Sequence, residues 1–142
     1  MSGVPPSPER LTLGERVLKA FDPDGALAST IDAFEVRSGQ RNMAVAVADI
    51  FESGGTLLAE AGTGTGKTLA YLIPALLSGR RVLVSTGTKN LQEQLYFKDL
   101  PLLHEALNIP FKATYMKGRN NYLCLHRFEA ACNSPMPRPT TD

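Results

Sequence analysis

The chain has 142 residues, of which 43% are hydrophobic and 20% are charged, and its formal net charge is +1. This length is enough for one domain with its own core, and the composition is ordinary for a globular protein. The balanced charge gives no argument for or against nucleic acid, and no apolar run approaches the roughly 20 residues that cross a membrane.

The N-terminal residues lack the basic and apolar regions of a signal peptide, so we expect a cytoplasmic protein without a membrane partner. Its two cysteines, Cys124 and Cys132, are then expected to be reduced. Residues 1–10 hold three prolines, two serines and a glycine, which predicts a disordered tail.

Helical spacing begins after this tail. Apolar residues recur at helical spacing over residues 11–21, and Thr12 is a candidate N-cap that pairs with Glu15. Residues 22–25 predict either a turn or the cap of a second short helix over 25–31. A third helix is expected over 40–52, ended by two glycines.

Residues 55–69 contain the strongest functional pattern in the sequence. An apolar stretch over 55–60, expected to be a strand, leads into Ala61-Gly62-Thr63-Gly64-Thr65-Gly66-Lys67-Thr68 and then into an amphipathic helix. That order is typical of a phosphate-binding loop, because glycines let the backbone approach a ligand and a helix N-terminus favours an anion. Lys67 is expected to contact the β- and γ-phosphates of a nucleoside triphosphate, and the Thr68 hydroxyl to bind Mg²⁺.

The first position of this loop is Ala61, where the strict pattern has glycine. A methyl group is a small intrusion at the end of a strand. The alternative, a Gly/Thr-rich turn without a ligand, does not explain why Lys67 and Thr68 follow the last glycine directly.

The rest of the chain alternates further helices and strands. An apolar stripe at helical spacing follows the loop, with an expected kink at Pro74. Strands are expected over 81–85 and 110–116, with a helix over 89–97, a break at residues 99–101 and a short helix after it. The fold class is therefore α/β: a partial P-loop nucleotide-binding domain with a parallel sheet and flanking helices.

A helix over 123–131 follows a polar, basic turn, and residues 133–142 show no pattern. No strand that ends in Asp-Glu follows Lys67. Because an ATPase needs such a group to hold Mg²⁺, these residues alone are expected to bind ATP weakly and to hydrolyse little of it.

Four segments in order carry a family resemblance. They are Arg37-x-x-Gln40, the loop from Glu60 to Thr68, residues 85–95 (STGTKNLQEQL) and residues 117–124 (KGRNNYLC). Together they resemble the DinG/YoaA branch of the XPD-like, iron–sulfur superfamily 2 DNA helicases. The resemblance implies a RecA-like first lobe over residues 11–117. It also implies the start of an iron–sulfur domain over 118–142, truncated and with a disordered end.

The resemblance assigns nucleotide and DNA contacts to residues outside the phosphate loop. Arg37 and Gln40 match the motif that recognises adenine, and a glutamine amide can both donate to and accept from that base. On the residues alone, both are ordinary surface residues at a helix start. Thr86, Gly87 and Thr88 match a motif that holds single-stranded DNA by its phosphates. The alternative there is a simple turn with Thr88 as N-cap.

Cys124 matches the first of four cysteines that bind a [4Fe–4S] cluster in that family, since thiolates are the ligands that such clusters take. The alternative is a buried, inert cysteine. Cys132 lies eight residues further on, without a close cysteine pair, and is interpreted as a non-ligand.

The resemblance thus implies the N-terminal part of an ATP-dependent DNA helicase, which moves 5′ to 3′ on single-stranded or forked DNA and acts in DNA repair. Two other readings stay open. One is a P-loop nucleotide-binding module without a DNA role, and the other is an inactive, truncated remnant.

Overall fold

The computed structural model describes residues 11–134 as a group of packed helices joined by extended segments. In chain order these residues form α1 (Leu13–Ala20), α2 (Ala26–Thr30), α3 (Ser38–Ser53), α4 (Lys67–Leu77), α5 (Lys89–Gln94), the π-helix η1 (Leu95–Asp99), α6 (Leu100–Leu107), the 3₁₀-helix η2 (Arg119–Asn121) and α7 (Leu125–Asn133). The predicted tail over 1–10 and most of the patternless stretch over 133–142 lie outside the described residues.

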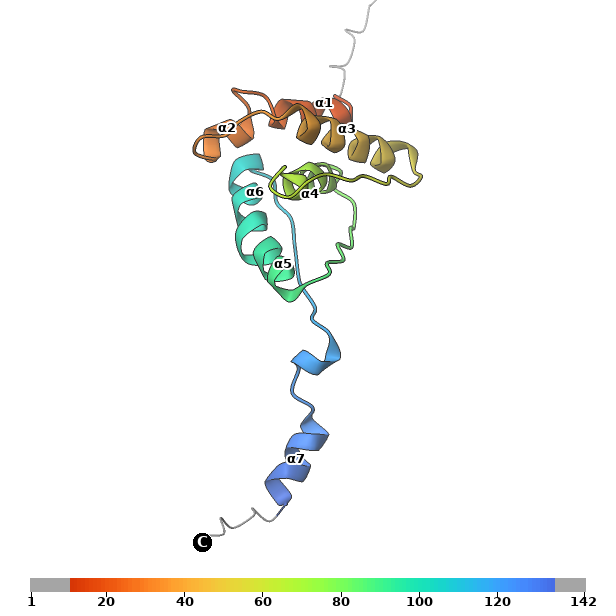
Figure 1. Ribbon diagram of the computed structural model, residues 1–142, viewed down its shortest axis with the longest axis vertical. Helices are drawn as coiled ribbons and strands as arrows, with labels where there is room; N and C mark the ends of the chain where they lie inside the picture. The colour runs from red at the N-terminus through yellow and green to blue at the C-terminus, as the bar shows by residue number, and fades with distance from the viewer. Residues whose placement is uncertain (1–10, 135–142) are drawn as a thin grey trace, which may run out of the picture.

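The core lies where α1, α3 and α4 pack against one another. Helices α1–α3 form an upper layer, α4 lies directly beneath them, and α5 and α6 descend beside α4 (Figure 1). The largest fully buried side chains are Val17, Phe21, Leu27, Ile73, Pro74 and Leu103. Burial of these apolar side chains is the main force that holds α4 in place under the upper layer.

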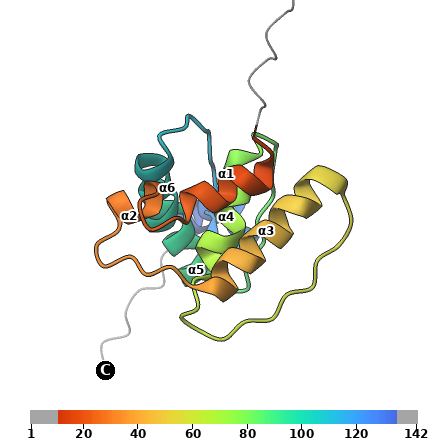
Figure 2. The same cartoon turned by 90° about the horizontal axis from the view of Figure 1, so that it is seen from above.

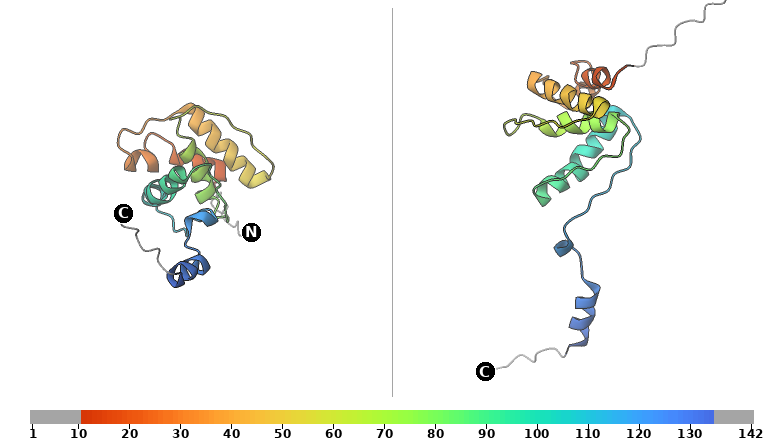
Figure 3. Two further views of the ribbon diagram at one scale, coloured as in Figure 1. Left: turned by 60° about the horizontal axis from the view of Figure 1, so that its bottom comes forward. Right: turned by 90° about the vertical axis from the view of Figure 1, so that its right-hand side faces the viewer.

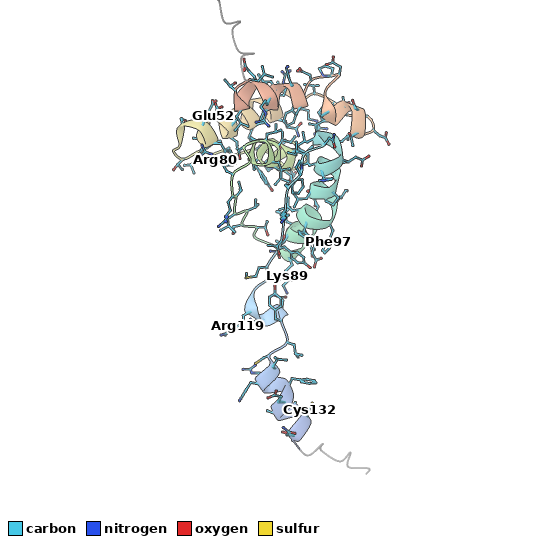
Figure 4. The ribbon with its side chains drawn as sticks, turned by 180° about the vertical axis from the view of Figure 1, so that it is seen from behind. Glu52, Arg80, Lys89, Phe97, Arg119 and Cys132 are labelled. Atoms are coloured by element: carbon cyan, nitrogen blue, oxygen red, sulfur yellow. The ribbon has the colours of Figure 1, made fainter. Side chains whose placement is uncertain are left out.

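The N-terminal helices follow the prediction. The Thr12 side chain accepts from the backbone N–H of Glu15, and Glu15 accepts in return from the backbone N–H of Thr12, at 3.2 and 2.7 Å. A carboxylate oxygen of Glu52 accepts from the backbone N–H of Leu13 at 2.7 Å, so α3 also caps α1; Glu52 is labelled in Figure 4. The second short helix forms as α2, and Gly54 ends α3 at a φ of 79°.

The helix from Lys89 corrects the prediction of a break at residues 99–101. Instead of stopping, α5 passes through the π-helix η1 directly into α6. Pro101 has no N–H to give to the carbonyl of Phe97, one turn earlier, and it lies in the first turn of α6, where that N–H is dispensable. The widened turn of the π-helix η1 lies immediately before α6.

The predicted parallel sheet is not formed within residues 11–134. The segments expected to be strands, over 55–60, 81–85 and 110–116, are without strand pairing. Figure 2 shows the connection from α3 to α4 sweeping around the outside of the helices. A strand exists only through hydrogen bonds to a neighbour, and these segments do not pair with one another.

The unpaired segments leave apolar side chains in solvent. Leu58 is 94% exposed and Leu83 is 93% exposed, although each lies in the middle of an apolar run. Of the predicted α/β fold, the described residues therefore show the helices but not the sheet.

Beyond α6 the chain leaves the helical group. Residues 108–118 run past α5 in extended form, and α7 projects away from the other helices (Figure 3). Residues 121–134 are exposed throughout. Within the described part of the chain, no helix has both the length and the apolar character needed to cross a membrane.

Candidate functional site

A cavity of about 650 Å³ lies between the start of α3 and the phosphate loop. Its lining residues are Val36, Arg37, Ser38, Gly39, Gln40, Met43, Ala59, Glu60, Ala61, Gly62, Thr63, Gly64, Thr65 and Lys67. Cavities of this size hold small-molecule ligands and cofactors. The fold therefore gathers the predicted nucleotide residues into one place, except Gly66 and Thr68, which lie at the N-cap and in the first turn of α4.

The loop backbone explains which positions require glycine. Gly64 and Gly66 adopt φ values of 74° and 81°, in the left-handed region that residues with a Cβ rarely enter. Ala61 is not among the described residues with positive φ, so its methyl group creates no backbone strain there. The departure from the strict motif is thus compatible with a normal phosphate loop.

Lys67 folds back onto the loop. Its Nζ donates to the backbone carbonyl oxygens of Ala61 and Gly62, both at 2.5 Å. These carbonyls hold the ammonium group at the cavity wall, where it is available to an anion. The loop is braced further by the Thr65 hydroxyl, which donates to the carbonyl of Gly62 at 2.9 Å.

Arg37 and Gln40 contact the loop rather than only facing solvent. The Arg37 guanidinium donates to the carbonyl of Gly64 at 2.6 Å, and Gln40 Nε2 donates to the carbonyl of Gly66 at 2.9 Å. Gln40 is 7% exposed, so the interpretation as a surface residue is wrong for it. A Cβ added at Gly66 would lie 2.1 Å from Gln40 Nε2, which shows how tightly the amide seats against the loop.

Thr68 has a neighbour that sequence reasoning missed. Tyr71, one turn later on α4, is half-buried, and burial raises the pKa of its phenol. A hydrogen bond with the Thr68 side chain lowers that pKa, and the negative charge of Asp99 raises it. Asp99 is buried in η1, although its sequence context suggested no role. Only the three-dimensional packing of η1 against α4 brings these side chains together.

The predicted DNA-contacting residues form the entry to α5. The Thr88 hydroxyl accepts from the backbone N–H of Leu91 at 3.2 Å, and the Thr86 hydroxyl donates to the carbonyl of Thr88 at 3.2 Å. Thr88 is therefore an N-cap, as the simpler reading held, and its role toward DNA stays a prediction. Thr86, Gly87 and Thr88 do not line the nucleotide cavity.

Two contacts tie α5 to the segment that leads to Cys124. Gln92 Nε2 donates to the carbonyl of Met116 at 2.7 Å, and Lys117 Nζ pairs with a Glu93 carboxylate oxygen at 2.6 Å. Hydrogen bonding to Lys117 lowers the pKa of Glu93, and the same bond raises the pKa of Lys117. Figure 4 labels Lys89 on α5 and Arg119 just beyond this junction.

The described residues cannot hold a [4Fe–4S] cluster by themselves. Cys124 precedes α7 and Cys132 lies within it, and both are exposed free thiols, so the reading of Cys124 as a buried cysteine is wrong. Residues 11–134 hold no group of three His, Cys, Asp or Glu side chains placed to bind a metal. A cluster requires four ligands, so no chemical step is derived through it.

A second cavity, of about 490 Å³, lies against η1 and α6. Tyr96, Phe97, Leu100, Pro101, His104, Phe111 and Ala113 line it. His104 is the one titratable side chain of the wall besides the Tyr96 phenol. The cavity beside the phosphate loop, with its ammonium and guanidinium groups, is therefore the stronger candidate for an anionic ligand.

Comparisons with known proteins indicate the family of the chain. Residues 40–124 match the DEAD/DEAH box helicase family. The chain is 54% identical over 109 residues to the ATP-dependent DNA helicase YoaA of Escherichia coli, covering 77% of this chain and 17% of that protein. It is 48% identical over 99 residues to the ATP-dependent helicase DinG of Mycobacterium tuberculosis, covering 64% and 15%.

A third relative carries a different name. The chain is 41% identical over 108 residues to the 3′-5′ exonuclease DinG of Bacillus subtilis, covering 73% of this chain and 12% of that protein. No solved structure matches the chain. The chain thus spans less than a fifth of the length of these relatives. Because the family match includes Gln40, the phosphate loop and the Thr86–Thr88 segment, the chain belongs to the DEAD/DEAH box helicase family.

Proposed function

We propose that this chain is the N-terminal, ATP-binding part of an iron–sulfur-type ATP-dependent DNA helicase that moves 5′ to 3′ along single-stranded or forked DNA. The observation that carries the proposal is the cavity in which Lys67, Arg37 and Gln40 surround the phosphate loop. The names of the relatives support the DNA substrate, the direction rests on the family resemblance as a whole, and the cluster rests on the resemblance of residues 117–124. The cytoplasmic location stays a prediction.

The residues of the cavity divide the work of binding ATP. Lys67 neutralises the charge of the β- and γ-phosphates, and the loop backbone and the start of α4 favour the same anion. Gln40 has an amide oxygen that can accept from the exocyclic amino group of adenine while its Nε2 holds Gly66. The Thr68 hydroxyl is the group that would hold Mg²⁺, and the cation would neutralise negative charge on the phosphates.

The extended segments are proposed to be strands of a RecA-like parallel sheet, the fold that the family match implies. Their neighbours would come from parts of the helicase outside this chain. The support is the exposure of Leu58 and Leu83, since central strands of a parallel sheet carry apolar residues on both faces. In that sheet Thr86–Thr88 would lie at the carboxyl end of a strand, where ligands of parallel sheets bind.

The test uses the full-length protein with Lys67 replaced by alanine. We expect Lys67→Ala to abolish ATP hydrolysis in the presence of single-stranded DNA, because no other side chain lining the cavity carries an ammonium group. Lys19→Ala is the matched control, since this lysine is exposed at the end of α1 and away from the loop. Wild-type turnover in the Lys67→Ala protein would overturn the assignment.

Because one relative is named an exonuclease, the same samples are assayed for DNA degradation. The proposal expects ATP-dependent strand separation without loss of nucleotides from either strand. Degradation that persists in Lys67→Ala would show that the DNA chemistry does not depend on this ATP site.

A further inference from the structure

A ring cluster, formed by Tyr96, Phe97 and Tyr115, lies where η1 meets the segment that follows α6, and the proposed ATP chemistry does not use it. The ring centroids of Tyr96 and Tyr115 lie 4.6 Å apart, and that of Phe97 lies 5.0 Å from Tyr96 and 5.5 Å from Tyr115. Phe97 is nevertheless 63% exposed, whereas its two neighbours are half-buried. A large apolar ring that is held by other rings and still open to solvent marks a contact surface.

Contacts from α5 fix the segment that carries Tyr115. Gln92 Nε2 donates to the carbonyl of Met116 at 2.7 Å, and Lys117 Nζ pairs with a Glu93 carboxylate oxygen at 2.6 Å. The same ammonium group lies 5.7 Å from the centroid of the Tyr115 ring, within the range of a cation–π interaction. The ring cluster is therefore built on two segments that are tied together, which gives it a defined geometry before any ligand binds.

Exposed cations accompany the ring cluster along the helical stretch. Lys89 lies one turn before Glu93 on the same face of α5, and Lys98 directly follows the exposed ring; both lysines are exposed. The acidic side chains of α5 and η1 are Glu93, which is paired with Lys117, and Asp99, which is buried. The stretch thus presents exposed ammonium groups and an open aromatic ring, without an exposed carboxylate that lacks a partner.

This combination fits a single-stranded nucleic acid better than a protein surface. Proteins hold single strands by stacking bases on aromatic rings and by placing cations near the phosphates. A protein partner that covered the ring would also desolvate the neighbouring ammonium groups, which is costly unless each finds a carboxylate. The position agrees, because Thr88 caps α5 and Phe97 lies nine residues later, roughly 13 Å along the helix. Figure 4 labels Lys89 and Phe97 on this stretch.

We infer that the ring cluster is a stacking platform for the bases of single-stranded DNA, and that the ammonium group of Lys89 contacts a phosphate of the same strand. The inference rests on the proposed function, because it takes the strand bound at Thr86–Thr88 as the one that continues along α5. Phe97 provides the open face, and the other two rings support it. The cavity of about 490 Å³ begins at Tyr96 and Phe97 and leaves room for a base beside the rings.

The test compares two strands on the full-length protein. One is a fluorescently labelled oligodeoxythymidylate, and the other is an abasic strand of the same length, which has phosphates but no bases. Phe97→Leu keeps the apolar bulk and removes the aromatic face. We expect it to weaken the oligodeoxythymidylate at least about 5-fold, the lower end of the range for one base–aromatic stack, and to leave the abasic strand unchanged. Phe97→Trp keeps an aromatic face and should bind the oligodeoxythymidylate as the wild type does.

The phosphate contact is tested by the salt dependence of the same binding. Lys89→Ala should reduce the slope of log affinity against log salt concentration by about 0.7, the value for one phosphate contact on a single strand. Phe97→Leu should leave that slope unchanged, because a stacked base displaces no counterion. The matched control is Phe128→Ala, an exposed ring on α7, which should change neither the affinity nor the slope. A Lys89→Ala slope equal to that of the wild type would remove Lys89 from the strand.

The outcomes separate the inference from the proposed function. A wild-type protein that binds neither strand contradicts the proposed function itself. A wild type that binds the oligodeoxythymidylate, with a Phe97→Leu protein that binds it equally well, overturns the inference alone. An equal loss on both strands also overturns it, because the bases are then not involved. A Phe97→Leu protein that unfolds, or melts at a clearly lower temperature, overturns it too, because the ring is then covered by another part of the full-length protein.

Discussion

Replacing Gln40 with alanine separates two roles that the structure and the family resemblance give to one side chain. The resemblance assigns its amide to adenine, whereas the structure shows Nε2 donating to the carbonyl of Gly66 at 2.9 Å. Loss of the amide removes a hydrogen bond on the loop itself. A change in the loop should weaken the binding of every ligand that the loop holds, whether or not the ligand has a base.

The size of the loss in affinity depends on which hydrogen bond the Gly66 carbonyl retains in the Gln40→Ala variant. The backbone N–H of Ala70 also donates to it, at 3.2 Å, so the oxygen does not become unsatisfied. The loss is then that of one ordinary hydrogen bond, about 0.5–1.5 kcal/mol, rather than the larger cost of an orphaned buried acceptor. That free energy corresponds to roughly 2- to 12-fold weaker binding.

The assay is displacement of a fluorescent ATP analogue from the full-length protein by ATP, by GTP and by inorganic tripolyphosphate, which has no base. We expect Gln40→Ala to weaken tripolyphosphate by that factor and ATP by at least as much. The control is Asn42→Ala, an exposed amide on the same helix. If Gln40→Ala leaves tripolyphosphate binding unchanged while the affinity for ATP falls to that for GTP, Gln40 acts on the base alone and not through the loop.

Three further predictions concern stability and metal content in the full-length protein. Gly25→Ala should lower the melting temperature, because the added Cβ would lie 2.3 Å from a backbone carbonyl oxygen at the end of α1. Such overpacking costs about 1–3 kcal/mol. Gly14→Ala is the control and should not lower the melting temperature, because no atom lies nearer than 4.0 Å to the added Cβ. Leu83→Asp should destabilise the protein strongly in denaturant titrations if residues 81–85 are a buried strand, whereas a change within about 0.5 kcal/mol would show that Leu83 stays exposed. Cys124→Ser should lower the iron and sulfide content of anaerobically purified protein and Cys132→Ser should not; equal content in both variants would remove Cys124 from the cluster.

The local features of the fold could be predicted because their causes are local. Three such features each depend on a few adjacent residues. They are the reciprocal cap of Thr12 and Glu15, the end of α3 at Gly54 and the start of α4 after Gly66. The predicted sheet is not confirmed, because strand pairing is not local. Residues 81–85 have the composition of a buried strand, but a strand needs a neighbour that composition cannot supply.

The candidate site shows the same division. The phosphate loop was readable from the spacing of its glycines before Lys67, whereas Tyr71 and Asp99 were not, since 28 residues and a π-helix separate them in the chain. Asp99 reads as a helix-breaking residue before Leu100 and Pro101. Its burial became evident only from the packing of η1 against α4.

The proposed coupling of this ATP site to movement on DNA is tested by steady-state ATP hydrolysis by the full-length protein across a titration of single-stranded DNA. We expect a saturable rise in rate with DNA that is absent from Lys67→Ala. A rate that is the same at every DNA concentration, in a protein that binds and hydrolyses ATP, would contradict it and identify a P-loop module without a DNA role.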